Sequence, residues 1–240
     1  MLDWLFPRVC ELCHEPSEHE LCPACIEKLP HVPLPICLYC GAPVAGEQTD
    51  PYRCAECTAR PRLYDFARSA LISHESTLQL IYRLKYHRAN YLAEALGGIL
   101  NTLWENTPGL MAHDDWALVP VPIGAGHLYA RGFNQTEELT RVLARLRGAR
   151  VISPLERRSG EAESQTRLSG GDRWRNAQLS YAPLPARAHS GKPLPRRLVL
   201  VDDVYTTGST ARACAKALKT LPGVETVAVL TVLRAARRGS

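Results

Sequence analysis

Apolar residues follow two alternating patterns along most of the chain: short unbroken runs, and longer stretches in which they recur every third or fourth position. The clearest run, residues 198–201, is too short for a helix and suits a strand covered on both faces, at the centre of a parallel sheet. Residues 116–121 read as a second strand that ends in Pro-Val-Pro, because proline stops ladder pairing. Residues 151–155 and 224–233 predict two more strands.

Amphipathic helices are predicted between these strands. The first begins at Ser76, a candidate cap, and has Leu78, Ile81 and Tyr82 on one apolar face. A second helix contains the pair at 97–98, Gly-Gly, a weakness that close packing would explain. A third follows Asn134, which is placed to cap it.

Strand and helix therefore alternate, which predicts an α/β fold: a parallel sheet flanked by helices, with ligands at the carboxyl ends of its strands. A chain of 240 residues holds one substantial domain and a small appendage. Residues 156–195 have no sustained apolar period and are rich in Arg, Ser, Gly and Pro. Such a segment is typical of a lid, a binding loop or a disordered stretch.

The run at 198–201 leads into two carboxylates, Asp202 and Asp203, which we expect to end the strand, and then into a small polar loop that opens a helix. At a helix N-terminus the unpaired N–H groups and the helix dipole favour an anion, and Gly208 lets the main chain approach it. Hydroxyl donors in the loop are Thr206, Thr207, Ser209 and Thr210. Vicinal sugar hydroxyls can donate to the carboxylates, so the pattern predicts a sugar-phosphate site. The alternative is a pair of capping acids beside an ordinary turn.

Residues 198–210 resemble the phosphoribosyl pyrophosphate (PRPP) signature of type I phosphoribosyltransferases. The resemblance implies a type I phosphoribosyltransferase-like sheet. Tyr205 departs from the signature, which usually has a small aliphatic residue there. We interpret Tyr205 as a packing difference.

Eight of the nine cysteines form four Cys-x-x-Cys pairs near the N-terminus: Cys10/Cys13, Cys22/Cys25, Cys37/Cys40 and Cys54/Cys57. Four such pairs supply the thiolates for two structural Zn²⁺ sites of four ligands each. Sequential pairing joins the first two pairs and the last two, and a cross-braced arrangement satisfies the same spacing. We therefore predict a zinc-binding double zinc finger module at residues 1–60 and a phosphoribosyltransferase-like domain at residues 61–240.

Other uses of the cysteines are a disulfide-stapled secreted domain or iron–sulfur ligation. The opening residues have no positive stretch and no long apolar core, so no signal peptide is expected. Four evenly built pairs also suit zinc better than iron–sulfur clusters. Cys214 stands alone in the apolar stripe of a predicted helix, which is typical of a core residue.

Charge is unevenly distributed along the chain. The net charge is +5, yet residues 1–60 contain nine acidic side chains against four basic ones. The cysteine module is therefore poorly suited to phosphate backbones and reads as a structural or protein-docking element, whereas the basic remainder suits a polyanionic ligand. No apolar run approaches the roughly 18 to 20 residues of a membrane span, so we expect no membrane insertion and a cytoplasmic location.

Further segments narrow the resemblance. They are the four cysteine pairs, Leu84-Lys85-Tyr86, Pro120-Val121-Pro122, Arg131-Gly132-Phe133-Asn134-Gln135, residues 164–168, and Arg173 with Asn176. Together with the PRPP signature they resemble the ComF family, in particular its ComFC and GntX branch, over nearly the whole chain. The resemblance implies a phosphoribosyltransferase-like protein linked to natural transformation or to the use of external DNA in bacteria.

The same resemblance implies roles for single residues. Asp202 and Asp203 would hold the ribose hydroxyls of PRPP, and residues 206–210 its 5-phosphate. The turn at Val121 and Pro122 corresponds to the pyrophosphate loop. Mg²⁺ would be carried mainly by PRPP itself, with the two aspartates in its outer shell.

Basic residues would face the leaving group. Arg131 is the candidate pyrophosphate-facing cation and, with the two aspartates, forms the expected catalytic set, because a guanidinium matches phosphate geometry. The alternative is an exposed loop arginine. Lys85 could serve the same group or be a solvated helix lysine. Gln165 and Arg167 lie on the expected lid. Asn134 and Gln135 are candidates only for capping a helix.

Two functional hypotheses from different classes remain. The first is a PRPP-dependent transferase that releases pyrophosphate and has an acceptor the sequence does not identify. The second is a non-catalytic adaptor that binds PRPP, a nucleotide or single-stranded DNA and docks onto DNA-uptake machinery, such as a helicase or another competence protein, through its zinc module.

Overall fold

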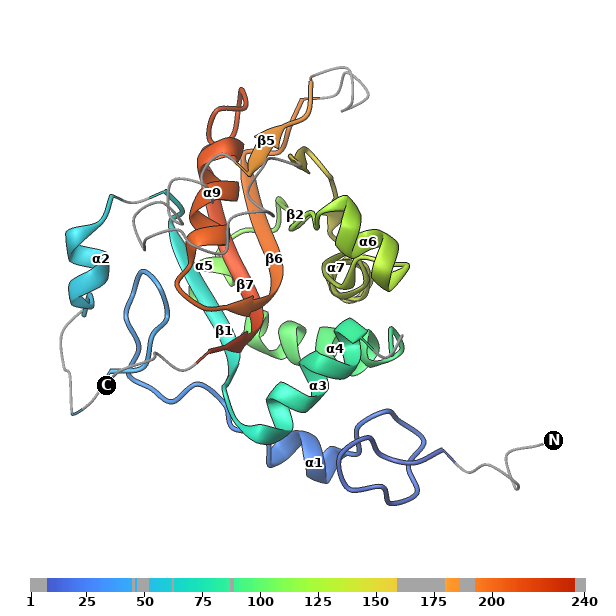
Figure 1. Cartoon of the computed structure of the whole chain (residues 1–240). Helices are drawn as coiled ribbons and strands as arrows, with labels where there is room; N and C mark the ends of the chain where they lie inside the picture. Colours follow the sequence, from blue (N-terminus) through green and yellow to red (C-terminus); the bar gives the residue numbers. More distant parts are fainter. Residues whose placement is uncertain are drawn as a thin grey trace, which may run out of the picture.

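The computed structural model describes residues 8–44, 46, 52–61, 63–86, 89–158, 180–185 and 193–235. Five parallel strands form the main sheet: β1 (Phe66–Ile72), β2 (Trp116–Pro120), β3 (Arg150–Val151), β6 (Arg197–Tyr205) and β7 (Thr226–Arg234). Their order is β1-β7-β6-β2-β3, so the predicted central strand, β6, is the middle one (Figure 1). Residues 198–201 of β6 are all fully buried, which explains their unbroken apolar sequence.

Helices cover both faces of this sheet. On one face lie α3 (Glu75–Tyr86), α4 (Leu92–Glu105) and α7 (Gln135–Arg147), whose apolar residues share one core with Val199 and Val201. On the other lies α9 (Ser209–Leu218), which packs over Leu198 and Leu200. The short helices are α1 (Pro23–Glu27), α2 (Ala55–Ala59), α5 (Pro108–Met111) and α6 (Ala125–Arg131).

One sequence-based expectation about α4 and α7 is confirmed in full and one in part, since close packing explains Gly97 but a Cβ on Gly98 would meet no atom within 4 Å. A Cβ on Gly97 would lie 2.5 Å from Cγ1 of Val142, so the glycine allows α4 and α7 to pack closely. Asn134 caps α7, since its side chain accepts a hydrogen bond from the amide of Thr136 at 3.1 Å.

The predicted apolar face of α3 was right for Ile81 but wrong for Leu78 and Tyr82. Its helix begins at Glu75 rather than after Ser76, and Thr77 accepts the amide of His74 at 2.9 Å. Leu78 and Tyr82 are 50% and 56% exposed, whereas Leu80, Ile81 and Leu84 are buried. The apolar residues of α3 lie on more than one face, so period alone does not identify the face that packs.

Strand boundaries also differ from the predictions. The predicted strand at 151–155 is instead the end of β3 followed by a separate β4 (Leu155–Arg157). β4 pairs antiparallel with β5 (Tyr181–Pro183), so two described parts of the segment 156–195 belong to a separate two-stranded sheet. β6 does not end at the aspartates but continues to Tyr205, because β7 still pairs with it there.

The N-terminal cysteine segments pack on the sheet domain. The edge of β1 is covered by them: the amide of Val32 donates to the carbonyl of Ala70 at 3.0 Å, and the amide of Ala67 donates to the carbonyl of Tyr39 at 2.7 Å. Covering an edge strand removes a site of unwanted pairing. The division into domains at residue 60 stays a prediction.

The predicted fold class is confirmed as an α/β chain with a five-stranded parallel sheet flanked by helices and an N-terminal cysteine module. Among the described residues, no helix is long and apolar enough to span a membrane.

Candidate functional site

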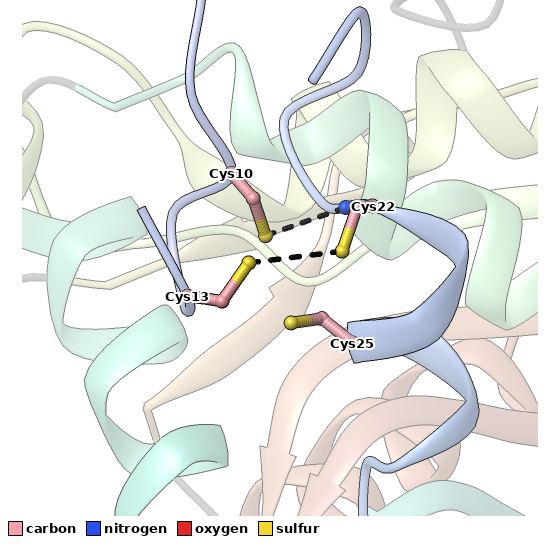
Figure 2. A group of neighbouring side chains, drawn as sticks. All are labelled: Cys10, Cys13, Cys22 and Cys25. Atoms are coloured by element: carbon pink, nitrogen blue, oxygen red, sulfur yellow. Dashed lines mark hydrogen bonds between the residues drawn. The ribbon is translucent and has the colours of Figure 1, made fainter. Parts of the chain in front are cut away.

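The eight N-terminal cysteines form two tetrads. Within each one the sulfur atoms all lie within 4.8 Å of one another. The first tetrad is Cys10, Cys13, Cys22 and Cys25, and the second is Cys37, Cys40, Cys54 and Cys57 (Figure 2 shows the first). Sequential pairing is therefore confirmed and the cross-braced alternative is wrong. All nine cysteines lie in the described part of the chain and none is in a disulfide.

The surroundings of the sulfurs fit zinc. The amide of Cys22 donates to the sulfur of Cys10 at 3.3 Å, and the amide of Cys54 donates to that of Cys37 at 3.4 Å. Burial raises the pKa of Cys10, but the backbone hydrogen bonds outweigh it and lower the pKa to about 6. Since a thiolate is the form that binds metal, each tetrad can hold a structural Zn²⁺.

The carboxyl end of β6 lies at a topological switch point. After β2 the chain moves outward to β3, whereas after β6 it moves the opposite way to β7, so the connections of these neighbouring strands diverge. Ligands of open α/β sheets bind at such crevices. Asp202 and Asp203 lie on β6 at this end, and the Pro120–Pro122 turn follows β2 beside it.

Asp203 is buried and carries two partners. The ammonium of Lys85 at the end of α3 lies 2.8 Å from its Oδ2, and the amide of Gln135 donates to the same oxygen at 3.1 Å. Lys85 is thus not a solvated helix lysine. Its charge is brought to the carboxyl end of the central strand, where it can act on an anion.

Arg131 is joined to Asp203 and Lys85 through Gln135. Its Nη1 donates to Oε1 of Gln135 at 2.8 Å, and its guanidinium carbon lies 5.0 Å from the centroid of the Tyr86 ring. Its Nε is buried and, among the described atoms, has no hydrogen-bond partner. A buried donor of this kind is costly unless another group accepts from it, so Arg131 is equipped to receive a further acceptor.

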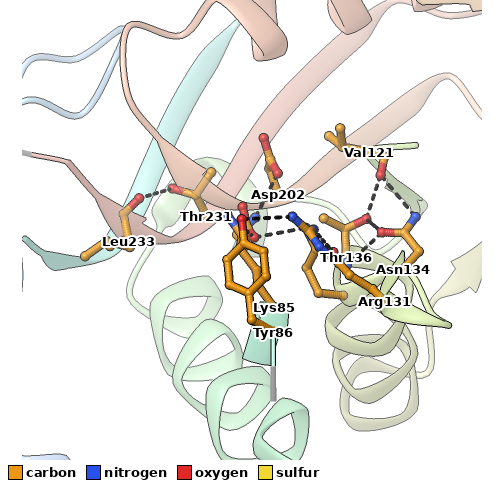
Figure 3. Close-up of polar contacts among 11 residues, drawn as sticks. Lys85, Tyr86, Val121, Arg131, Asn134, Thr136, Asp202, Thr231 and Leu233 are labelled. Atoms are coloured by element: carbon orange, nitrogen blue, oxygen red, sulfur yellow. Dashed lines mark hydrogen bonds and ion pairs between the residues drawn. The ribbon is translucent and has the colours of Figure 1, made fainter. Parts of the chain in front are cut away.

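Asp202 faces the other side of β6. Adjacent residues of a strand point to opposite faces, and Asp202 is directed away from Lys85 (Figure 3). Burial, followed by the charge of Asp203, raises the pKa of Asp202 to about 8. Burial and then the charge of Asp202 raise the pKa of Cys214, which places this aspartate towards α9. Cys214 itself is fully buried, as expected for a core residue.

The predicted phosphate-binding segment, residues 206–210, forms the turn between β6 and α9. Gly208 is the N-cap of α9 with a φ of 73°, and the hydroxyl of Thr207 accepts from the amide of Ser209, the first residue of the helix, at 3.4 Å. Thr206 and Thr207 are exposed, and Ser209 and Thr210 are partly exposed. The hydroxyl of Thr207 donates to that of Ser209 at 3.2 Å. The segment thus offers hydroxyls and a helix N-terminus at one place, as the sequence predicted.

The Pro120–Pro122 turn is fixed by α7. The carbonyl of Val121 accepts from the hydroxyl of Thr136 at 2.6 Å and from the amide of Asn134 at 3.3 Å (Figure 3). Val121 is buried, and its own amide donates to the carbonyl of Val201 at 3.0 Å. Asn134 therefore does more than cap a helix: it ties the turn after β2 to the same helix that carries Gln135.

The sequence did not reveal the roles of Gln135 and Tyr86. Gln135 joins Arg131 to Asp203, and Tyr86 stacks under Arg131, although nothing in their spacing predicts a shared site. The predicted lid residues Gln165 and Arg167, and also Arg173 and Asn176, lie outside the described residues. Tyr205 is 6% exposed, in agreement with a packing role.

Comparison with known proteins supports the cysteine module and shows which proteins the whole chain resembles. Residues 1–60 match the double zinc ribbon domain. Competence protein F of Haemophilus influenzae is 28% identical over 225 residues, which cover 91% of this chain and 92% of that protein. DNA utilization protein YhgH of Escherichia coli K12 is 28% identical over 221 residues, covering 88% and 91%.

A shorter match links the chain to a third relative. Competence protein ComFC of Streptococcus pneumoniae is 29% identical over 110 residues, 46% of this chain and 44% of that protein. These comparisons confirm the resemblance to the ComF family: the chain is a relative of Competence protein F, ComFC and YhgH, and it has a double zinc ribbon domain at its N-terminus.

Proposed function

We propose that the chain is a cytoplasmic PRPP-binding protein of phosphoribosyltransferase type that serves the use of DNA. The observation that supports it most strongly is the meeting of Asp202, Asp203 and the N-terminus of α9 at the carboxyl end of the central strand. Acids for sugar hydroxyls and donors for a phosphate ester are thus adjacent. The names of the relatives, which refer to competence and DNA utilization, support the biological setting.

The basic cluster supplies what the leaving group needs. Lys85 and Arg131 are held at the β6 end by Asp203 and Gln135, where they can neutralise a pyrophosphate. Mg²⁺ bound with PRPP would add positive charge at the pyrophosphate and ribose oxygens, with Asp202 and Asp203 nearby. In the reaction, the bond from ribose C1 to pyrophosphate breaks, pyrophosphate leaves with the electron pair, and the acceptor bonds to C1 and loses a proton.

Calorimetric titration with PRPP and Mg²⁺ tests the proposal. We expect binding by the wild type, and affinity at least about tenfold weaker for Asp202→Asn/Asp203→Asn, because charge-assisted hydrogen bonds are lost. Glu138→Gln, a surface change on α7 outside the site, is the matched control. If the wild type does not bind PRPP, both the proposed PRPP binding and the proposed transferase activity are refuted. Binding without pyrophosphate release from any base or amine tested would leave only the adaptor.

The raised pKa of Asp202 gives a second test. An ionised carboxylate accepts sugar hydroxyls best, so binding should expel the proton that Asp202 retains below about pH 8. We expect affinity for PRPP and Mg²⁺ to rise between pH 6 and 8 more steeply in the wild type than in Asp202→Asn. The ligand titrates equally in both measurements, so only their difference reports on Asp202. Equal slopes would contradict the assigned role.

Stability should change with pH in the opposite direction. Between the ordinary pKa near 3.8 and about 8, the folded chain retains the Asp202 proton while the unfolded chain has lost it. The free energy of unfolding should therefore fall as pH rises through this window, and Asp202→Asn should flatten the curve. Urea unfolding at pH 5 and pH 8 measures the difference.

The second candidate is a DNA-binding adaptor that docks onto a DNA-uptake helicase through the zinc module. It is favoured by the names of the relatives and by the net charge of +5. Single-stranded DNA affinity that falls steeply with salt would support it, since each phosphate contact releases counterions. An affinity that does not change with salt would contradict it.

A further inference from the structure

We propose that Tyr205 and Arg234 are positioning residues that connect the second cysteine tetrad to the 206–210 loop. Through them, metal binding at this tetrad and ligand binding at the loop favour one another. The inference rests on the proposed function, because that function assigns a phosphate ester to the loop. The connection itself consists of contacts between described residues.

The first contact joins Arg234 to a metal ligand. Arg234 is the last residue of β7 and is 6% exposed. Its Nη1 donates to the carbonyl of Cys40 at 2.7 Å, and its Nη2 lies 3.6 Å from the sulfur of Cys40. A guanidinium in this position lowers the energy of the negative charge on a thiolate tetrad. It also fixes the main chain at Cys40, in the turn between Cys37 and Cys40 that we call the second knuckle; the turn between Cys10 and Cys13 is the first.

The second contact joins Arg234 to Tyr205. The two residues are paired in neighbouring strands, and the guanidinium carbon lies 4.7 Å from the Tyr205 ring centroid. The Tyr205 hydroxyl also lies 2.6 Å from that of Tyr64, whose ring stacks on Tyr39 with centroids 4.5 Å apart. Since Tyr39 precedes Cys40, Tyr205 contacts groups tied to the second knuckle at both its ring and its hydroxyl.

The third contact reaches the loop. A Cβ built on Gly208 would lie 2.2 Å from the Tyr205 hydroxyl oxygen. The tyrosine therefore lies directly against the α-carbon of the residue that caps α9. A shift of the Tyr205 ring must be accompanied by a shift of Gly208, because packed groups cannot interpenetrate. The geometry of the N-terminus of α9 thus depends on the position of Tyr205, which its contacts with the second knuckle fix.

The first tetrad has different neighbours. Its polar contacts run to the helical face: Glu11 pairs with Arg83 of α3 and accepts from the hydroxyl of Tyr91 at 2.6 Å. Its apolar residues Leu21 and Leu29 join the core under α3 and α4. The chain therefore contains its own control, a second metal site of the same ligand type that is not connected through Tyr205.

The metal side is tested first, by hydrogen exchange of full-length protein without added ligand. We expect Cys57→Ser to speed amide exchange in residues 204–212 by about tenfold, and Cys25→Ser, the equivalent change in the first tetrad, to leave it unchanged. Arg234→Gln keeps all eight cysteines. A preparation of this variant that contains two zinc ions should also show faster exchange of the amides in residues 204–212. Equal effects of Cys57→Ser and Cys25→Ser, or no effect of Arg234→Gln, would overturn the proposal.

The ligand side is tested by zinc release to a chromogenic chelator. PRPP with Mg²⁺ should slow the release of one of the two zinc ions by about tenfold in the wild type, because coupling between sites is reciprocal. Tyr205→Phe removes only the hydroxyl and should abolish this slowing while the protein still binds two zinc ions. Slowing that persists in Tyr205→Phe would contradict the link. If PRPP does not bind at all, the proposed function fails, whereas the exchange experiment still decides the connection.

Discussion

The cysteine repeat occurs twice, at residues 9–27 and 36–59, with the same local structure in both copies and different surroundings. Each copy has an isolated bridge, a left-handed residue after its second cysteine and a short helix that starts after its third. The equivalent pairs are Val9↔Pro16 and Ile36↔Pro43, His14 and Gly41, and α1 and α2. Metal-ligand spacing therefore determines the turn, independently of what the turn packs against.

The surroundings separate the two copies. The first lies near α3 and α4, and the second lies on the β1 side of the sheet (Figure 1). Three of the four cysteines are buried in the second tetrad and only Cys10 in the first. A repeat that is duplicated in sequence has thus become part of two different cores. We infer that the first copy chiefly supports the helical layer and that the second supports the strand ends that carry the candidate site.

The largest expected difference comes from removing equivalent ligands. Cys57→Ser should lower the melting temperature by more than about 10 °C, because it weakens a zinc site built into the core around β1 and α9. Cys25→Ser should lower the melting temperature by less than half as much. Differential scanning calorimetry with zinc content measured for each variant provides the comparison. A larger loss for Cys25→Ser would reverse the assignment of the two copies.

The left-handed residue gives the next largest difference. A Cβ on Gly41 would lie 2.6 Å from the carbonyl oxygen of Ala67, and φ is 70°. Gly41→Ala should cost about 2 to 4 kcal/mol, from left-handed strain and from displacing β1. His14, with a φ of 60°, is exposed, so His14→Gly should change stability by less than about 1 kcal/mol. Urea unfolding of both variants tests whether only the second copy is pressed against the sheet.

These details show how far sequence could predict the module. The Cys-x-x-Cys spacing was enough for both metal sites, since four thiolates around one ion leave few arrangements. It could not choose sequential over cross-braced pairing, which depends on how the chain returns in space. It also gave no sign that Gly41 and His14 differ in surroundings, because contact with β1 comes from residues distant in sequence.

In the candidate site too, local features could be predicted from the sequence and contacts between distant residues could not. The strand, the aspartates and the loop at 206–210 are contiguous and could be predicted from local pattern. The partners of Asp203 come from α3 and α7, and the contacts of Tyr205 come from β7 and from the segment before β1. A single sequence does not record which distant side chains converge, so Gln135 and Arg234 could be recognised only in the folded chain.

A smaller effect is expected from one hydroxyl of the second copy. The Tyr39 hydroxyl accepts the amide of Leu63 at 2.9 Å, while the equivalent position of the first copy is Leu12. Tyr39→Phe retains the stack with Tyr64 but removes this acceptor, so it should cost about 1 to 2 kcal/mol. Tyr129→Phe, at a side chain that is 94% exposed, is the control and should have no effect. Equal stability of the two variants would show that the hydrogen bond from Leu63 to the second knuckle does not stabilise the segment leading into β1.

The smallest effect concerns the ion pair that joins the first copy to the helices. Glu11→Gln removes the carboxylate that pairs with Arg83 and accepts from Tyr91, and these side chains are partly exposed. Exposed and partly exposed pairs contribute little, so the expected cost is below about 1 kcal/mol, and it should shrink in 1 M salt. Glu94→Gln, which breaks the more exposed pair with Arg145, is the control and should cost less still. A loss for Glu11→Gln as large as that for Gly41→Ala would mean that the first copy is held as firmly as the second. The contrast between a knuckle resting on helices and one built into the sheet would then be wrong.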